Sequence, residues 1–365
     1  QRNITLNGAL AADLAAGPIF PLPLPSLDRQ PPAGTVDVTF AGDDFRNPYT
    51  QQADLGIERE VARDVAFTAS YMWSRGIQLW TLRDMNIGPI GPNVTYNIFN
   101  DAGAQTGTFT TPAYLIANRV NSRWRRVNQV ENGGQSWYNG LVTQLKMRKK
   151  SHQMQFSYTW SHAIDYNQGA GSDNVFFSSV RSLYNGDFRY DKSTSTLDQR
   201  HRASFSSIHQ PTFTRSDSGL AKFLVNNWQL SQITTYGAKT YSTPVIFVSG
   251  TPYTGAPFTN TLNGFGGSTR VPFQPVSSLP AQSVFRTDAR LTKILPFTER
   301  YNLQINFEVF NLFNNVSDTT VRNQAFQATA GAIRPTPRLG EGSASAGFPD
   351  GTNARRAQIS ARFVF

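Results

Sequence analysis

The stretch ARRAQISARFVF, Ala354–Phe365, ends the chain and alternates small or apolar side chains with polar ones. Successive side chains of a β-strand point to opposite faces, so Ile359, Phe363 and Phe365 would share one face, and Val364 is the exception to the alternation. A half-buried strand of a soluble sandwich would show the same pattern. The alternation of this stretch alone therefore does not distinguish a strand with one face in lipid from a strand of a soluble sandwich, and the rest of the chain has to decide.

A period of two recurs along the chain and predicts further strands. The clearest cases are QADLGIE (Gln52–Glu58), AFTASYMWS (Ala66–Ser74), QMQFSYTW (Gln153–Trp160), FRTDARLTK (Phe285–Lys293) and YNLQINFEV (Tyr301–Val309). We also interpret Phe223–Val248 as one long strand, bent or bulged near Gly237. With the weaker patterns, the sequence predicts about nine or more strands.

Short and long links alternate between these strands. The short links are Val61–Asp64, Lys149–His152, a segment around Pro211–Ala221, and Pro296–Arg300. The long links fall near Thr81–Gln135, Ala163–Leu197, Gly250–Ser283 and Asn314–Asn353. An up-and-down membrane barrel has short periplasmic turns and long extracellular loops, whereas a compact soluble domain rarely carries several long structureless links. The spacing predicts an all-β fold, a partial transmembrane antiparallel up-and-down β-barrel.

The composition fits this fold and narrows the partners. The chain has 26 Phe, 13 Tyr and 6 Trp, yet its mean hydropathy is only −0.38, as expected for strands that alternate lipid-facing with polar residues. The net charge is +10, but the basic residues are scattered and no nucleic-acid-binding signature accompanies them. The absence of Cys excludes disulfides and thiolate metal sites. No run approaches a membrane helix of about 20 residues, and no signal peptide is recognised at the start of the sequence.

The alternation assigns residues to two faces. The predicted lipid-facing band contains Leu55, Ile57, Phe67, Leu141, Leu145, Phe156, Leu303, Ile305, Phe307 and Ile359. The opposite, lumen face contains Asp54, Glu58, Asp288, Arg290, Asn306, Glu308 and Arg362. We expect Glu308 to pair across its hairpin with Arg290 or Arg286. We expect Tyr71, Trp73, Tyr158 and Trp160 to lie near strand ends on the long-loop side as membrane-interface anchors.

No pattern of catalytic or cofactor-binding residues stands out, so the sequence predicts neither an enzyme nor a bound cofactor or metal. The four His show no H-E-x-x-H spacing and no G-x-S-x-G element is present. The acids of DFRYD, Asp187–Asp191, lack the EF-hand ligand pattern. We expect them to be solvated loop residues.

Several stretches, in order, resemble the TonB-dependent outer-membrane receptors, and most closely their Oar-like group. The longest is RTDARLTKILPFTERYNLQINFEVFNLFNNVS, Arg286–Ser317, which resembles the penultimate hairpin of that family. The others are NPYTQQADLGIERE (Asn47–Glu60), SYMWSRG (Ser70–Gly76), SWYNGLVTQLKMR (Ser136–Arg148), FSYTWSHAID (Phe156–Asp165), LDQRHRASFS (Leu197–Ser206) and WQLSQITTY (Trp228–Tyr236). Outer-membrane barrels of this kind commonly finish on a strand with a terminal aromatic, which implies that Phe363 and Phe365 form an assembly signal.

The resemblance implies a C-terminal barrel portion (47–365) preceded by the tail of an extracellular loop (1–46). It implies residence in the bacterial outer membrane and energised uptake of an unidentified ligand. The implied partners are outer-membrane lipid and lipopolysaccharide, the barrel-assembly machinery, and the TonB complex, reached through a plug and N-terminal segment that this sequence does not show. Other interpretations remain open at this point: a passive porin, an adhesin-like surface barrel, or a soluble glycan-binding β-sandwich. In the membrane interpretation Arg286, Asp288, Arg290 and Glu308 line the lumen as a ladder of charges.

Overall fold

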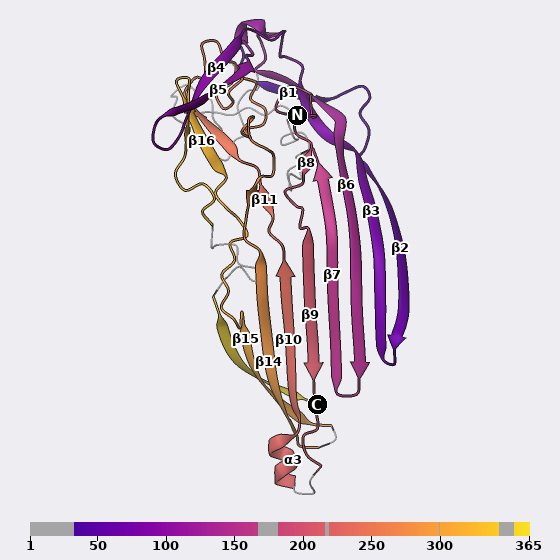
Figure 1. The fold of residues 1–365 in the computed structure, drawn as a ribbon. Helices are drawn as coiled ribbons and strands as arrows, with labels where there is room; N and C mark the ends of the chain where they lie inside the picture. The colour runs from indigo at the N-terminus through magenta and orange to yellow at the C-terminus, as the bar shows by residue number, and fades with distance from the viewer. Residues whose placement is uncertain (1–32, 167–181, 216–218, 299, 343–353) are drawn as a thin grey trace, which may run out of the picture.

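A large antiparallel sheet forms most of the molecule (Figure 1). The computed structural model describes residues 33–166, 182–215, 219–298, 300–342 and 354–365. Within them, the spatial order of the main sheet is β18-β15-β14-β10-β9-β7-β6-β3-β2. Its strands are β2 (Tyr49–Ala62), β3 (Val65–Asp84), β6 (Arg126–Lys149), β7 (His152–Asp165), β9 (His201–His209), β10 (Trp228–Gly237), β14 (Val284–Pro296), β15 (Asn302–Phe310) and β18 (Arg356–Val364). Each strand pairs with its neighbours along the chain, as in an up-and-down barrel.

The sheet is open. In the described part of the chain, β2 and β18 each pair on one side only, while β1 (Asp37–Ala41) adds to β6 and β8 (Ser193–Thr194) adds to β7. Nine consecutive antiparallel strands confirm the predicted fold class and make the sheet a partial barrel. β3 has 20 residues and β6 has 24, about twice the 9–11 that a membrane-crossing strand requires. These strands therefore continue well beyond a bilayer.

The long links carry structure of their own, contrary to the expectation of structureless loops. β12 (Val245–Ser249), β16 (Gln324–Thr329), β17 (Ala332–Pro335), β4 (Asn93–Phe99) and β5 (Gln105–Pro112) form a second sheet in this order. We call it the loop sheet. It lies at the end of the main sheet where the long links gather, with the 3₁₀ turn η1 (Ile116–Asn118) and the small pair β11 (Tyr241–Ser242) and β13 (Leu279–Pro280) in the same links.

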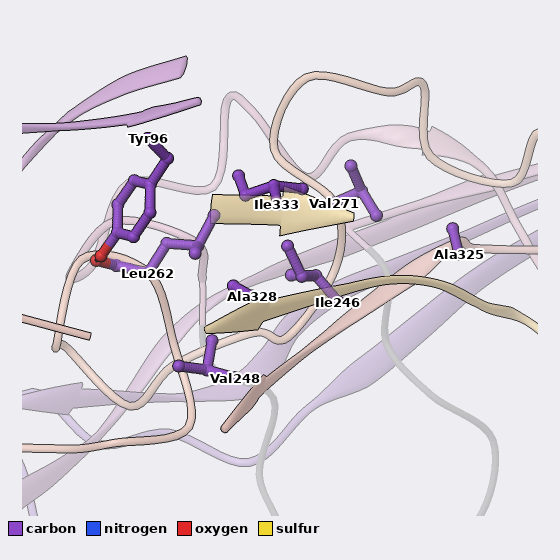
Figure 2. Packing of buried hydrophobic residues seen from close by; sticks show 8 residues of the cluster. All are labelled: Tyr96, Ile246, Val248, Leu262, Val271, Ala325, Ala328 and Ile333. Atoms are coloured by element: carbon purple, nitrogen blue, oxygen red, sulfur yellow. The ribbon is translucent and has the colours of Figure 1, made fainter. Parts of the chain in front are cut away.

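The buried apolar core belongs to the loop sheet. Figure 2 shows its side chains, which come from three of the long links: Tyr96, Ile246, Val248, Leu262, Val271, Ala325, Ala328 and Ile333. Tyr96 and Ile333 are almost fully buried, and the Tyr96 hydroxyl donates a hydrogen bond to the Leu262 carbonyl oxygen at 2.7 Å. The links therefore form a packed unit.

The prediction of one long strand over Phe223–Val248 was wrong. The segment contains the end of α3 (Gly219–Val225), then β10, β11 and β12. Asn227 has a φ of 62°, a left-handed conformation that turns the chain between α3 and β10. At Gly237, a Cβ would come within 2.4 Å of the Gln199 side-chain nitrogen, and Pro244 follows. β10 therefore ends at Gly237. At its other end, the link from β9 to β10 runs from Gln210 to Asn227, which is longer than predicted, and it contains α3.

Candidate functional site

The main sheet has one apolar and one polar face, as the alternation predicts. Cross-strand rows such as Phe67–Leu145–Phe156–Phe205 and Leu230–Leu291–Phe307–Ile359 run across it on one side. We call this side the apolar face. Its side chains are well exposed: Leu55 is 75% exposed, Phe156 43% and Ile359 73%. A soluble sandwich would bury such a face beneath a second sheet, yet the buried core cluster described above contains no residue of this face.

The other side, the polar face, borders a hollow of about 920 Å³. Strands from β2 to β15 line it, and they bring acids and bases together: Glu58, Glu60, Lys146, Arg148, Asp288, Arg290 and Glu308. The rest of the lining mixes polar residues, including Gln153, Gln155, Ser206 and Ser231, with apolar ones such as Ile208 and Ile233. Charges of both signs on a wet surface suit the lining of a channel and not a face turned to hydrocarbon.

Arg290 and Glu308 lie opposite each other on β14 and β15. The Arg290 Nε donates to Glu308 Oε1 at 2.6 Å, and the Gln358 side-chain amide on β18 donates to the other carboxylate oxygen. Glu308 is only 6% exposed. Each of its carboxylate oxygens accepts a hydrogen bond from a neighbouring strand. These contacts link side chains of three neighbouring strands, β14, β15 and β18.

Arg286 contacts Asp288 and not Glu308. Its Nε donates to Asp288 Oδ1 at 2.9 Å, and the same oxygen accepts the backbone N–H of Asn311 at 2.8 Å. Arg286 is buried, with 5% exposed. The four charged residues proposed for the ladder thus form two pairs on one face, Arg286 with Asp288 and Arg290 with Glu308.

The four predicted interface anchors lie on the apolar face. Tyr71 is 49% exposed and Trp160 54%; both flank Leu141 in register. The Tyr71 hydroxyl donates to the Asn139 side-chain oxygen at 2.8 Å, and the Tyr158 hydroxyl lies 2.8 Å from His201 Nδ1. They do not lie at strand ends, because β3 continues past Trp73 to Asp84 and β7 past Trp160 to Asp165.

A second group of aromatics lies at the opposite end of the apolar face. Phe363 on β18 stacks on Tyr301 with ring centroids 6.0 Å apart, and on Phe365 at 6.4 Å. Phe363 is 55% exposed and Phe365 90%. Aromatic rings at two heights on an exposed apolar face are the arrangement of the two interfacial girdles of a membrane barrel.

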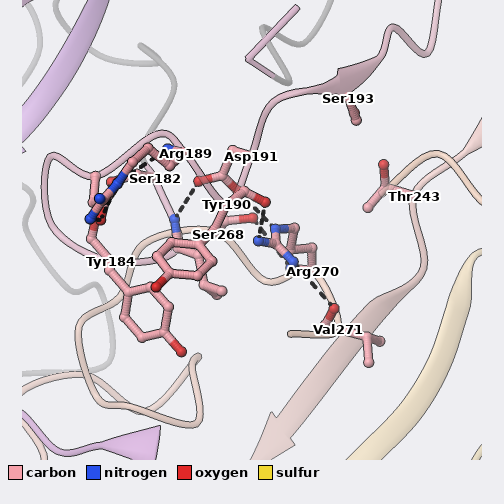
Figure 3. A network of polar contacts seen from close by, with 12 residues as sticks. Ser182, Tyr184, Arg189, Tyr190, Asp191, Ser193, Thr243, Ser268, Arg270 and Val271 are labelled. Atoms are coloured by element: carbon pink, nitrogen blue, oxygen red, sulfur yellow. Dashed lines mark hydrogen bonds and ion pairs between the residues drawn. The ribbon is translucent and has the colours of Figure 1, made fainter. Parts of the chain in front are cut away.

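The expectation that DFRYD is a set of solvated acids was wrong for Asp191. Figure 3 shows Asp191 against Arg270, whose Nε donates to Asp191 Oδ1 at 2.8 Å and whose terminal nitrogen donates to the Tyr190 carbonyl at 2.6 Å. The two side chains are 5% and 2% exposed. Burial raises the pKa of Asp191, against the opposing effect of Arg270 and the Leu183 N–H. By contrast, Asp187 pairs with Arg189 near the surface, and that hydrogen bond lowers the pKa of Asp187.

A buried pair of this kind joins two long links near the loop sheet, and the sequence offers no local signal for it. A second junction is the Tyr253 hydroxyl, which donates to the carbonyl oxygens of Tyr114 and Asn263, each 2.6 Å away. Burial raises the pKa of Tyr253 to about 12. Within the described ranges, no three His, Asp or Glu side chains lie close enough to hold a metal ion, and no helix is long and apolar enough to cross a bilayer.

The fold and its two faces define an outer-membrane barrel wall. Residues 3–254 match the family described as outer membrane beta barrel domain, and the chain therefore belongs to this family. The apolar face is its lipid-facing surface and the protein resides in the outer membrane. No protein with a curated description matches the chain.

Solved structures with a similar fold are outer-membrane transporters and receptors of low sequence identity. The outer membrane transporter YddB from Escherichia coli is 11% identical with a TM-score of 0.46, over 90% of this chain and 34% of its own. The FrpB iron transporter from Neisseria meningitidis is 9% identical with a TM-score of 0.43, over 90% and 33%. The ferric-catecholate import receptor Fiu from E. coli is 13% identical with a TM-score of 0.38, over 88% and 28%. The chain spans about a third of the length of these structures.

Proposed function

We propose that this chain is the C-terminal barrel portion of a TonB-dependent outer-membrane transporter of the Oar-like group. The observation that carries the proposal is the coincidence of the family-like stretches with successive wall strands. Asn47–Glu60 falls on β2, Ser136–Arg148 on β6, Trp228–Tyr236 on β10, and Arg286–Ser317 spans the β14–β15 hairpin. Several motifs that occur in the family's order, each on its own wall strand, support descent from such a barrel more strongly than any single motif does.

In this proposal the polar face is part of the lumen wall. Of the two pairs, Arg290 and Asp288 are the more exposed partners, at 54% and 21%, and would present charges of both signs to a plug or to a passing ligand. Glu308 and Arg286 would hold them in position. The loop sheet would carry the ligand-contacting segments on a packed base. Two loop regions that we consider candidates for ligand contact, near Ala163–Leu197 and Asn314–Asn353, lie partly outside the described residues.

The remaining assignments complete the proposal. Residues 47–365 would form wall, lumen lining and loops, and residues 1–46 the tail of an extracellular loop, of which 1–32 lie outside the described residues. Phe363 and Phe365 would be recognised by the barrel-assembly machinery, and Tyr71, Trp73, Tyr158 and Trp160 would anchor the wall at the interface with lipopolysaccharide. The plug and the TonB-contacting segment would belong to the rest of the full-length protein.

Planar-bilayer conductance separates energised transport from a passive porin. A TonB-dependent transporter keeps its lumen closed by a plug, so the purified full-length protein should show no steady conductance in KCl. Steady open channels would favour the porin, which the hollow on the polar face makes the second candidate.

Fractionation of cells that express the wild type and Phe365→Ser tests the assembly signal: we expect the variant to be lost from the outer membrane. A variant that assembles as well as the wild type would remove this role from Phe365.

A further inference from the structure

The short helix α3 exposes apolar side chains at the turn end of the wall. It lies between β9 and β10, at the end of the main sheet opposite the loop sheet (Figure 1). Leu220 is 68% exposed, Phe223 46% and Leu224 57%. These three positions are spaced i, i+3 and i+4 and so share one side of the helix. Lys222 is also exposed; it follows Leu220 by two residues and so lies on the other side of the helix. Phe213, in the segment before α3, adds another exposed ring.

Contacts from the lipid-facing side of the wall hold this helix. Trp228 and Lys293 are cross-strand partners on β10 and β14, and they share the apolar face with Leu230 and Leu291. The Trp228 indole N–H donates to the Leu224 carbonyl at 3.0 Å. The Lys293 ammonium donates to the carbonyls of Phe223, of Leu224 at 3.2 Å and of Asn226 at 2.6 Å.

These contacts explain a lysine on a lipid-facing strand surface. Lys293 is only 8% exposed, and a cation facing hydrocarbon is costly unless its donors are satisfied. The last carbonyls of a helix lack partners within the helix and carry its partial negative charge. Lys293 satisfies them while they satisfy Lys293, so the pair attaches α3 to the lipid-facing side of the wall and away from the hollow.

Aromatic side chains mark the height of α3 on the wall. Phe297, Tyr301, Phe363 and Phe365 lie at the same end of the apolar face, and each is at least 46% exposed. Such rings favour the boundary between headgroups and hydrocarbon. Because Trp228 and Lys293 attach α3 to the apolar face, the helix lies beside the lipid-facing surface at this end of the wall.

We propose that α3 is an interfacial anchor that inserts Leu220, Phe223 and Leu224 into the periplasmic leaflet of the outer membrane. An amphipathic helix that lies in the interface buries its apolar side a few ångströms deep, and its basic residues contact headgroup phosphates. Lys222 provides the basic contact, extending its long side chain toward the phosphates. The occupant of this surface is phospholipid, and the anchor does not depend on what the barrel transports.

Site-specific labelling tests the anchor, because the chain contains no Cys. Leu220→Cys and Leu224→Cys would be labelled with an environment-sensitive fluorophore in the full-length protein, reconstituted in phosphatidylethanolamine–phosphatidylglycerol vesicles, with any cysteine outside this chain replaced. Lys222→Cys is the control on the same helix, and Val120→Cys, at a position 74% exposed near η1, is the control at the loop end. The quenchers are a lipid with a nitroxide just below the headgroup and iodide in the aqueous phase.

The anchor predicts that nitroxide lipid removes most emission at positions 220 and 224 while iodide leaves it unchanged, with the reverse at position 120 and less lipid quenching at 222. Iodide quenching at positions 220 and 224 would mean that the helix faces water. Resistance to both quenchers would mean that protein covers it; either result overturns the proposal. Lys293→Met supplies a second test: with its attachment lost, position 224 should become accessible to iodide while the protein stays in the vesicle. Unchanged quenching in this variant would refute the attachment.

Discussion

Introducing a charge on each face of the wall in turn tests the sidedness on which the barrel assignment rests. Phe156 and Ser157 are neighbours on β7 and point to opposite faces. Phe156 belongs to the apolar row with Leu145 and Phe205, whereas Ser157 lies between Gln144 and Ser204, which carry no charge. Phe156→Arg therefore places a cation in lipid, and Ser157→Arg places the same cation on the polar face.

The depth of Phe156 sets the expected cost. It follows His152, the first residue of β7, by four positions. At about 3.3 Å per residue and a strand tilt of about 40°, the Phe156 side chain lies about 10 Å from the turn end of the wall. That is close to the middle of an apolar band about 25 Å tall, where an arginine costs about 2–4 kcal/mol. Ser157→Arg should change stability by no more than about 0.5 kcal/mol.

Reversible unfolding in guanidinium from lipid vesicles, followed by tryptophan fluorescence, measures the difference. With about 1.4 kcal/mol for each factor of ten, Phe156→Arg should lower the folding equilibrium constant by about 30- to 700-fold. It should also reduce the amount of protein that reaches the outer membrane, while Ser157→Arg should match the wild type in both assays. Equal costs for the two variants, or a larger cost at Ser157, would refute the assignment of the faces.

Three further predictions concern the polar contacts. Arg270→Met leaves Asp191 buried without its cation and should destabilise the junction of the long links by about 3–5 kcal/mol, which would be seen as faster hydrogen exchange there. Adding Asp191→Leu should restore much of the protection against exchange. An unchanged exchange rate in Arg270→Met would contradict the role of the pair. The folded-state pKa of Asp191 is raised above its ordinary value, so its contribution to stability should grow as the pH falls toward the ordinary Asp pKa of about 4. The pKa of Asp187 is lowered, so its contribution should fall only below about pH 4. Hydrogen exchange as a function of pH distinguishes the two. Glu308→Ala removes the acceptor of Arg290, whose side chain is 54% exposed and can be hydrated instead, so the loss should be about 0.5–1.5 kcal/mol. It would be measured as a lower temperature at which the folded, faster-migrating band disappears from gels of heated samples.

The wall could be predicted from the sequence because its signal is local. In a strand with one face in lipid and the other in water, every second residue reports its environment, so Gln153–Trp160 or Tyr301–Val309 reveals its own faces without knowledge of its neighbours. A pairing of Glu308 with Arg290 or Arg286 across the hairpin could be expected from the short link between the two strands, and the register of the structure places Arg290 opposite Glu308. The heights of Tyr71 and Trp73 within β3 did not follow, because nothing local marks where a strand continues past the bilayer.

The loop sheet could not be predicted because its signal is not local. β12 and β16 pair in parallel, as do β17 and β4, although these strands belong to different long links. Each is short, and the alternation within four to seven residues is too brief to distinguish it from an irregular loop. The Asp191–Arg270 pair is likewise a contact between links remote in sequence, so Asp191 was indistinguishable from a solvated acid until the surrounding packing was known.

The two parts of the molecule are stabilised in different solvents, and this has a consequence for function. The wall buries its apolar side chains only when lipid covers them, whereas the loop sheet buries Tyr96, Ile246 and Ile333 within itself. The described links therefore do not need a ligand to become ordered, and a ligand would meet a preformed base. Since β3 and β6 pair from Val65–Met147 near the turn end to Asp84–Asn128 beneath the loop sheet, the same hydrogen-bonded ladder supports both parts.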